Sequence, residues 1–239
     1  MFDAESLTKS YHSVTAIEDV SLHVDRGEVF GLLGSNGAGK TTILKVFATL
    51  LRPDAGRAAV AGISVVDDPL AVRARIGYVP ESPELYPKLT GREFLHLVGA
   101  LRGMPQARIA ASVDEIAKVL RLDRELTVEL DACSRGMRQK VALASAMFPR
   151  PEALILDEPT DGLDPRYARA LKDWLRAYAD AGGTVLLSTH ATEVAAAICD
   201  RIAIVHDGRI RAVDTVHGLL ERTGSESLED AFIATVGGL

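Results

Sequence analysis

The segment from Gly34 to Thr41 carries residue types that bind phosphate, in the order Gly-Ser-Asn-Gly-Ala-Gly-Lys-Thr. It fits the pattern G-x-x-x-x-G-K-[ST], in which glycines let the backbone curl until successive N–H groups point at anionic oxygens. The N-terminus of a following helix would add about half a positive charge at the same point. Lys40 is expected to reach the β- and γ-phosphates of a nucleotide, and the Thr41 hydroxyl to hold Mg²⁺.

The sequence on both sides of this segment supports the interpretation. Residues 28–33 form a short apolar run typical of a buried strand, and residues 42–48 carry apolar side chains at helical spacing. Strand, glycine loop and helix form the context that the pattern requires, whereas a chance glycine-rich turn before a lysine does not explain both flanks. The expected nucleotide-binding residues of the loop are Gly34, Ser35, Asn36, Gly37, Ala38, Gly39, Lys40, Thr41 and Thr42.

A second group of polar side chains follows two later apolar strands. Residues 153–156 lead into Asp157 and Glu158, and residues 184–188 lead into Thr189 and then His190. Ligands of open parallel sheets gather at the carboxyl ends of the strands. We expect Asp157 to hold Mg²⁺ and Glu158 to act on the attacking water. The alternatives are a solvated acidic turn for the two acids and a structural histidine for His190.

The run Ser134-Arg135-Gly136-Met137 opens a helix predicted over residues 138–148. Ser134 is a typical helix cap, and Gly136 leaves room for close backbone approach. Together they make a second helix N-terminus suited to an anion. Taken alone the motif is weak, because an ordinary capped helix would also explain it.

The remaining pattern predicts an α/β fold. Strands and helices alternate along the two ends of the chain, which indicates a parallel sheet with helices on both faces. Residues 14–25 alternate as a strand with one buried face, while residues 85–150 are mostly helical and begin with a capping box at Thr90 and Glu93. From Asp214 onward the sequence predicts two short helices joined at Gly224 and Ser225.

The bulk composition excludes several classes of protein. The chain has 239 residues, of which 47% are hydrophobic and 25% charged, enough for a large buried core. Its net charge of −6 argues against a nucleic-acid partner. Cys133 and Cys199 share no metal or redox spacing and are expected to be small buried hydrophobes. With no signal peptide and no apolar run of about 18 residues, the expectation is a soluble intracellular protein.

Several of these motifs fall in the order found in one protein family. Over essentially its whole length the chain resembles the nucleotide-binding subunit of an ATP-binding cassette (ABC) transporter. Residues 34–41 match the Walker A motif, and residues 154–158 match Walker B. Residues 161–164, Asp-Gly-Leu-Asp, resemble the D-loop, and His190 matches the switch histidine.

The resemblance implies an architecture and two cofactors, ATP and Mg²⁺. The expected fold is a phosphate-loop NTPase core with a mostly parallel sheet, an N-terminal antiparallel β subdomain and an inserted helical subdomain. All belong to a single ABC ATPase domain. The core would cover approximately residues 1–84 and 150–213, the helical subdomain 85–149, and a short C-terminal helical tail 214–239.

The resemblance also assigns residue roles. Tyr11 would stack on adenine, although an ordinary surface tyrosine of a β-hairpin is a real alternative. His190 would contact the γ-phosphate, and Asp164 belongs to the D-loop. The signature residues that would complete the site of the opposite subunit, in a homodimer or heterodimer, are Ser134, Arg135, Gly136 and Met137.

Two positions depart from the family's usual text. Residues 133–137 read Cys-Ser-Arg-Gly-Met in place of Leu-Ser-Gly-Gly-Gln, which is similar to exporter-type, ABC-2-like ATPases. At the Q-loop, Glu81 stands in place of glutamine and can still offer an oxygen to Mg²⁺. The alternative is that Glu81 is only a surface charge.

The resemblance points to the ATP-hydrolysing subunit of an ABC exporter, at the inner face of the cell membrane through a separate membrane-spanning permease. Residues 82–87 combine two prolines with Leu85 and Tyr86, which suits a docking surface for the permease unless both side chains pack under the helical insert. The main alternative function is an ABC ATPase switch that regulates a membrane protein without transport. An ABC ATPase of DNA repair or translation and a phosphate-loop kinase fit less well.

Overall fold

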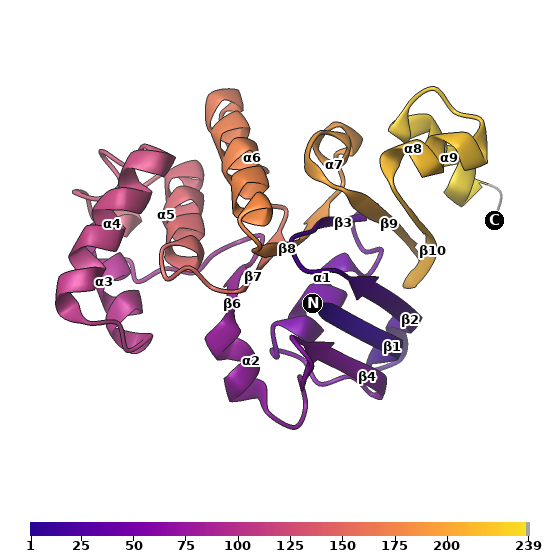
Figure 1. The fold of residues 1–239 in the computed structure, drawn as a ribbon, viewed down its shortest axis with the longest axis horizontal. Coiled ribbons are helices and arrows are strands. Elements are labelled where there is room, and N and C mark those ends of the chain that lie inside the picture. Colours follow the sequence, from indigo (N-terminus) through magenta and orange to yellow (C-terminus); the bar gives the residue numbers. More distant parts are fainter. Residues whose placement is uncertain (238–239) are drawn as a thin grey trace.

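A six-stranded sheet forms the centre of the computed structural model, which describes residues 1–237 (Figure 1). Its strand order is β10-β9-β3-β8-β7-β6. The neighbours from β9 to β6 run parallel, and only β10 is antiparallel to its partner. The strands are β3 (Val29–Leu33), β6 (Ile76–Val79), β7 (Ala153–Asp157), β8 (Thr184–Thr189), β9 (Arg201–His206) and β10 (Arg209–Asp214). The expected mostly parallel sheet is therefore confirmed.

A second, antiparallel sheet comes from the N-terminal part of the chain, as the resemblance implied. Its order is β2-β1-β4-β5, with β1 (Phe2–Tyr11), β2 (Val14–Val24), β4 (Ala55–Val60) and β5 (Ile63–Ser64). The predicted strand over 14–25 is present, but its simple alternation is wrong. Ile17 is buried and Val14 exposed, because the pairing of β1 with β2 shifts register and Asp19 adopts a φ of +52°.

Helices cover both faces of the parallel sheet. They are α1 (Lys40–Phe47), α2 (Pro69–Arg75), α3 (Gly91–Leu101), α4 (Gln106–Leu120), α5 (Arg135–Met147), α6 (Pro165–Asp180), α7 (Thr192–Ile198), α8 (Val216–Thr223) and α9 (Leu228–Gly237), with a short 3₁₀ helix at Leu130–Ala132. The two predicted C-terminal helices are thus confirmed as α8 and α9. Within residues 1–237 no helix combines the length and the apolar character that crossing a membrane requires.

The central strands supply two cores by simple alternation. Ile155 of β7 faces a cluster that contains α1 and the antiparallel sheet, including Phe2 and Phe47. Its neighbours Leu154 and Leu156 face the opposite cluster, which contains α4, α5 and α6. Successive strand side chains point to opposite faces, so strands buried on both sides become continuous apolar runs.

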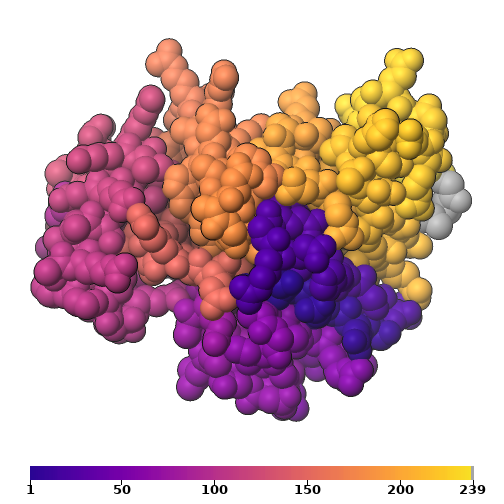
Figure 2. Space-filling view, viewed as in Figure 1, coloured from indigo at the N-terminus to yellow at the C-terminus, as the bar shows by residue number. Residues whose placement is uncertain are grey.

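The helices α3, α4 and α5 follow one another without a strand and form one lobe of the molecule (Figures 1 and 2). The predicted capping box is present: Thr90 accepts the Glu93 backbone N–H, and Glu93 accepts the Thr90 N–H. The helix predicted over 138–148 begins earlier, at Arg135, because Ser134 caps it by accepting the Met137 N–H. The local signal for the cap was correct, and the predicted start was three residues late.

Candidate functional site

The glycine-rich loop connects the end of β3 to the start of α1, at the carboxyl edge of the parallel sheet. The Gly34 N–H donates to the Thr189 carbonyl at 3.3 Å, which ties the loop to the end of β8. A Cβ on Gly34 would lie 2.4 Å from the Val205 carbonyl oxygen, and Gly39 has a φ of +106°. Glycine is therefore required at both positions. No side chain caps α1, so its first N–H groups remain directed at the loop.

Lys40 is the first residue of α1 and is almost fully buried. Its Nζ donates to the carbonyl oxygens of Gly34 at 2.6 Å and Ser35 at 3.1 Å. The same Nζ lies 3.4 Å from Glu158 Oε1. A buried ammonium group needs such partners, and here they hold its charge inside the curve of the loop.

Asp157 ends β7 with its side chain in the interior, and the residue is only 1% exposed. Ser188 of β8 donates its hydroxyl to Asp157 Oδ1 at 2.5 Å. The same hydroxyl oxygen accepts the Glu158 backbone N–H at 2.9 Å. One serine therefore fixes both acids of the predicted Walker B segment.

Glu158 adopts a φ of +47°, a left-handed conformation that costs a non-glycine residue about 1–3 kcal/mol. The surrounding contacts maintain it. His190 follows β8, and its backbone N–H and its Nδ1 lie 3.3 and 3.0 Å from Glu158 Oε2. Lys40 approaches one carboxylate oxygen and His190 the other. The turn in the backbone thus aims the carboxylate between the loop and the half-exposed histidine.

A cavity of about 370 Å³ opens over the loop. It is lined by Ala16, Ser35, Asn36, Gly37, Ala38, Gly39, Lys40, Thr41, Thr42, Glu81 and Glu158. Glu81 is exposed on the wall of this cavity; it is far from the loop residues in sequence but lines the same cavity. The sequence-predicted loop residues from Ser35 to Thr42 therefore share one cavity with two of the predicted acids.

The donor set around this cavity fits Mg²⁺ bound together with a nucleotide. Thr41 supplies a hydroxyl, and the carboxylates of Asp157 and Glu81 belong to the same edge of the sheet. Among residues 1–237 there is no group of three or more His, Cys, Asp or Glu side chains arranged for a metal. Mg²⁺ sites of phosphate-binding proteins use one or two carboxylates and complete the shell with phosphate oxygens and water.

Tyr11 lies elsewhere than the loop residues. It ends β1, is exposed, and is absent from the wall of the cavity, where Ala16 of β2 stands instead. Its predicted stacking on adenine stays a prediction.

The predicted signature residues also lie outside this cavity and contact the segment 161–164 of their own chain. Arg135 forms an ion pair with Asp161 at 2.8 Å. A Cβ on Gly136 would lie 3.2 Å from the Gly162 carbonyl oxygen. Asp164 caps α6 by accepting the Tyr167 N–H at 3.0 Å. The two loops therefore form one continuous surface at the N-termini of α5 and α6.

Burial raises the pKa of three weakly acidic groups. Burial, and after it the charge of Asp157, raises the pKa of Tyr78 in β6 to about 12. Burial raises the pKa of Cys199 to about 12 and also raises that of Cys133. Both cysteines are free thiols. Cys133 is buried, as expected, whereas Cys199 is partly exposed.

Sequence reasoning missed Ser188, which bonds to both Asp157 and Glu158. A signal was available, because Ser188 stands two residues before His190, near the end of a strand predicted from the sequence. A strand-end serine is common, however, and only the register of β7 with β8 brings its hydroxyl to the acids.

Comparisons with known proteins agree with this geometry. The protein-family model for the ABC transporter matches residues 17–161. The daunorubicin resistance ATP-binding protein DrrA3 of Streptomyces coeruleorubidus is 41% identical over 92% of this chain and 70% of its own length. The ABC transporter ATP-binding protein NatA of Bacillus subtilis is 35% identical over 92% of this chain and 90% of its own length.

Two solved structures extend the comparison to three dimensions. The structure of an ATP-binding subunit of an ABC transporter has a TM-score of 0.92 and 33% identity, and the match covers 98% of this chain and 99% of that one. A dimeric ATP-binding cassette in a post-hydrolysis state, bound to ADP and Pi, has a TM-score of 0.81 and 27% identity. That match covers 90% of this chain and 98% of the other.

Proposed function

The chain belongs to the ABC transporter family and is an ATP-binding, ATP-hydrolysing subunit, and from this premise we propose that it powers export through a separate membrane-spanning permease. The observation that carries the proposal is the convergence of Lys40, Glu158 and His190 beside the glycine-rich loop. The relatives support the direction of transport, because they include daunorubicin resistance and Nod factor export ATP-binding proteins. The permease, rather than this chain, would contact the exported molecule.

In the proposed mechanism the loop N–H groups and Lys40 hold the phosphates, and Tyr11 stacks on the adenine. Lys40 leaves its carbonyl partners for the β- and γ-phosphates, which are stronger acceptors for an ammonium group. Glu158 then polarises the attacking water. His190, which lies beside the Glu158 carboxylate, contacts the γ-phosphate. Positioning and charge stabilisation of this kind account for most catalysis of phosphoryl transfer.

The proposed Mg²⁺ ligands are Thr41 and Asp157, with Glu81 as a further carboxylate. When bound, the ion would neutralise charge on the phosphate oxygens. Ser188 donates to one oxygen of Asp157 and so leaves the other available as an acceptor. The exposed position of Glu81 lets its side chain approach or leave the cavity without a burial cost.

The site is proposed to be completed by a second ATPase subunit, identical or different. Ser134, Arg135, Gly136 and Met137 do not line the cavity of their own chain, and Ser134 lies exposed at the N-terminus of α5. A similar cassette is dimeric with ADP and Pi bound. The surface that residues 134–137 form with the D-loop would therefore face the γ-phosphate bound by the opposite subunit.

The permease is proposed to dock on the surface around residues 82–87, which would hold the chain at the inner face of the cell membrane. Tyr86 is 60% exposed, and its ring centroid lies 6.3 Å from that of Phe94. Leu85 is partly buried. Exposed apolar groups gathered in this way are typical of a protein-docking surface.

Co-purification from native membranes tests the partner. We expect the chain to bring down a multi-spanning membrane protein, and Tyr86→Asp to weaken this capture while the isolated subunit keeps its ATPase activity. Ile233→Asp is the matched control, because Ile233 is similarly exposed but lies on α9. If Tyr86→Asp captures the permease normally, or loses its fold by circular dichroism, the surface is not the docking site. ATP hydrolysis itself is tested separately, by Pi release from Mg-ATP with Lys40→Ala as the negative control.

A further inference from the structure

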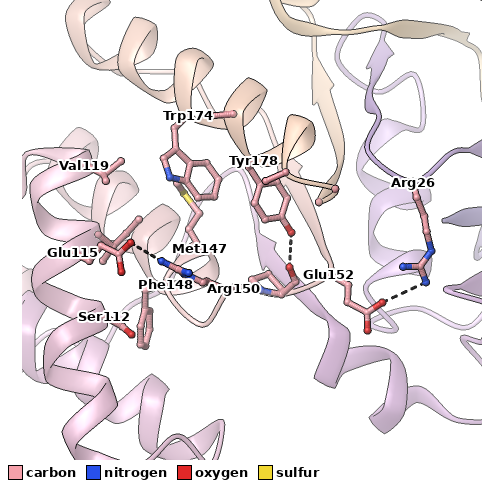
Figure 3. A pocket seen from close by; sticks show the side chains of 16 residues that line it. Arg26, Ser112, Glu115, Val119, Met147, Phe148, Arg150, Glu152, Trp174 and Tyr178 are labelled. Atoms are coloured by element: carbon pink, nitrogen blue, oxygen red, sulfur yellow. Dashed lines mark hydrogen bonds and ion pairs between the residues drawn. The ribbon is translucent and has the colours of Figure 1, made fainter.

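A cavity of about 470 Å³, whose lining side chains are drawn in Figure 3, lies apart from the cavity over the glycine-rich loop. Its walls come from α4, α6 and the turns that precede β7 and β8. The lining includes Ser112, Glu115, Ile116 and Val119 of α4, Met147, Phe148, Arg150 and Glu152 around the end of α5, and Trp174 and Tyr178 of α6. Its volume is within the range of about 300–1,000 Å³ typical of small-molecule sites.

The cavity is at the amino edge of the parallel sheet, whereas the nucleotide site is at the carboxyl edge. Strand β7 begins beside the cavity at Ala153 and reaches Asp157 four residues later, about 13 Å away at 3.3 Å per residue. No residue that lines the loop cavity also lines this one. It is therefore a separate site.

Two stacked aromatic rings contribute to the apolar lining of the cavity. Trp174 and Tyr178 stack with their ring centroids 5.1 Å apart and their planes at 14°. The Tyr178 hydroxyl donates to the Pro151 carbonyl at 2.6 Å, which fixes its ring (Figure 3). Met147 and Phe148 continue the apolar lining. Stacked rings and a thioether make a surface that suits a planar aromatic molecule.

The rim of the cavity is charged, and its main ion pair can be exchanged. Arg150 and Glu115 are 2.5 Å apart, with side chains 71% and 60% exposed. Such exposed pairs contribute about 0–1 kcal/mol, so an incoming anion can replace Glu115 at small cost.

A second cavity of about 550 Å³ shares Ser112, Glu115, Phe148 and Arg150 with the first, so the ion pair stands between the two. The charged side chains of both cavities are Arg26, Arg102, Arg108, Arg150, Glu115 and Glu152. Arginines thus outnumber acids, which favours a ligand with negative charge.

We propose that this cavity binds a small amphipathic ligand with a planar aromatic body and one anionic group, such as a carboxylate or sulfonate. The aromatic body lies against Trp174 and Tyr178. The anion takes the guanidinium of Arg150 from Glu115 and forms charge-assisted hydrogen bonds to it.

The position of the cavity gives binding a consequence for catalysis, which rests on the function proposed above. Helix α5 runs from the signature cap at Ser134 to the cavity wall at Met147, and α6 runs from the D-loop cap at Asp164 to Trp174 and Tyr178. Each helix is a rigid element, about 20 Å long for the 13 residues of α5. A ligand that moves the cavity ends of α5 and α6 relative to each other therefore shifts the signature surface at their opposite ends, and the ATPase rate changes.

The probe for the test is anilinonaphthalene sulfonate, an aromatic anion. Trp174 is the single tryptophan of the chain, so its emission reports on this cavity alone. We expect the probe to quench Trp174 in a saturable way and to gain fluorescence with the same midpoint. Saturating Mg-ADP should not displace it. Phenylnaphthylamine, a similar body without the sulfonate, should bind at least tenfold more weakly, because it lacks the charge-assisted bonds.

Two matched variants separate the anion site from general apolar binding. Arg150→Gln should weaken sulfonate binding about tenfold, and Glu115→Gln should strengthen it by freeing Arg150. Neither change should affect phenylnaphthylamine. Arg92→Gln is the control. Arg92 of α3 forms a similar exposed ion pair outside the cavity, with Asp114, the neighbour of Glu115 on α4. All three are exposed positions, so the fold should be kept.

The proposal is overturned if Mg-ADP displaces the probe, if Trp174 emission does not respond, or if Arg150→Gln binds the sulfonate as the parent does. It is also overturned if vesicles of anionic phosphatidylglycerol quench Trp174 where the soluble probe does not, because the site would then take a lipid. These binding measurements need no hydrolysis. A chain that binds the probe but releases no Pi from Mg-ATP would contradict the proposed function and leave this site standing.

Discussion

Two regions of this molecule that carry predicted site residues differ in how far they are buried. The strand-end cluster, made of Lys40, Asp157, Glu158 and Ser188, is buried, and each member contacts another member. The signature surface at the N-termini of α5 and α6 is open: Arg135 and Asp161 have side chains 58% and 41% exposed and contact each other. The first is organised within one chain, whereas the second is open to solvent, as the proposed sharing of the site between two subunits requires.

The largest expected effect is in the strand-end cluster. Glu158→Gln should keep ATP binding and lower turnover about 10²- to 10⁴-fold, because a positioned base supplies a factor of that size. Steady-state Pi release at saturating Mg-ATP measures it, with nucleotide binding followed in parallel. Turnover near that of the parent would show that another group activates the water.

Ser188→Ala tests whether the cluster depends on its internal hydrogen bonds. It leaves the buried Asp157 carboxylate and the Glu158 N–H without that partner, which should cost about 1–3 kcal/mol of unfolding free energy. Turnover should fall about tenfold through misplacement of Glu158. Ser145→Ala is the control, since the Ser145 hydroxyl bonds only to a carbonyl within its own helix. Equal effects of the two substitutions on turnover would remove Ser188 from the account.

Glu81 shares a feature with each region, since it is exposed to solvent like the signature surface yet lines the loop cavity. Glu81→Gln should raise the Mg²⁺ concentration for half-maximal activity by about two- to tenfold, because an amide binds the ion more weakly than a carboxylate. Glu84→Gln, exposed and outside the cavity, should leave it unchanged. An identical metal dependence for both variants would make Glu81 a surface charge.

The smallest effect is expected on the signature surface of the isolated chain. A double-mutant cycle of Arg135→Ala and Asp161→Ala should give a coupling of about 0–1 kcal/mol in unfolding free energy, the usual value for exposed ion pairs. A coupling well above that range would mean that this surface is stabilised for its own chain, as the strand-end cluster is.

The strand-end cluster was the more predictable of the two regions. Asp157 and Glu158 follow a short apolar run, and the carboxyl ends of parallel strands bring them to the loop that carries Lys40 by topology alone. The N-terminal capping box at Thr90 and the helix cap at Ser134 could also be predicted, because each depends on residues only three apart in the sequence.

Features that depend on register or on distant contacts were not predictable. Ser188 meets Asp157 only through the pairing of β7 with β8, and the irregular register of β2 with β1 cannot be read from a strand's own alternation. The ion pair of Arg135 with Asp161 joins residues from separate segments of the chain. The short helix α2 and strand β10 carried too little periodicity to be recognised.

The most direct test of the split site mixes two inactive proteins. Lys40→Ala lacks the phosphate contact, and Ser134→Arg lacks the signature serine, so each should be nearly inactive alone. A heterodimer of the two has one interface with both groups intact. If the site is shared, mixing equal amounts should restore up to about a quarter of the parent activity per subunit, since random pairing makes half the dimers mixed and leaves one working site in each. Activity that stays at the sum of the separate proteins at every mixing ratio, with heterodimers demonstrated by pull-down of differently tagged subunits, would contradict the account.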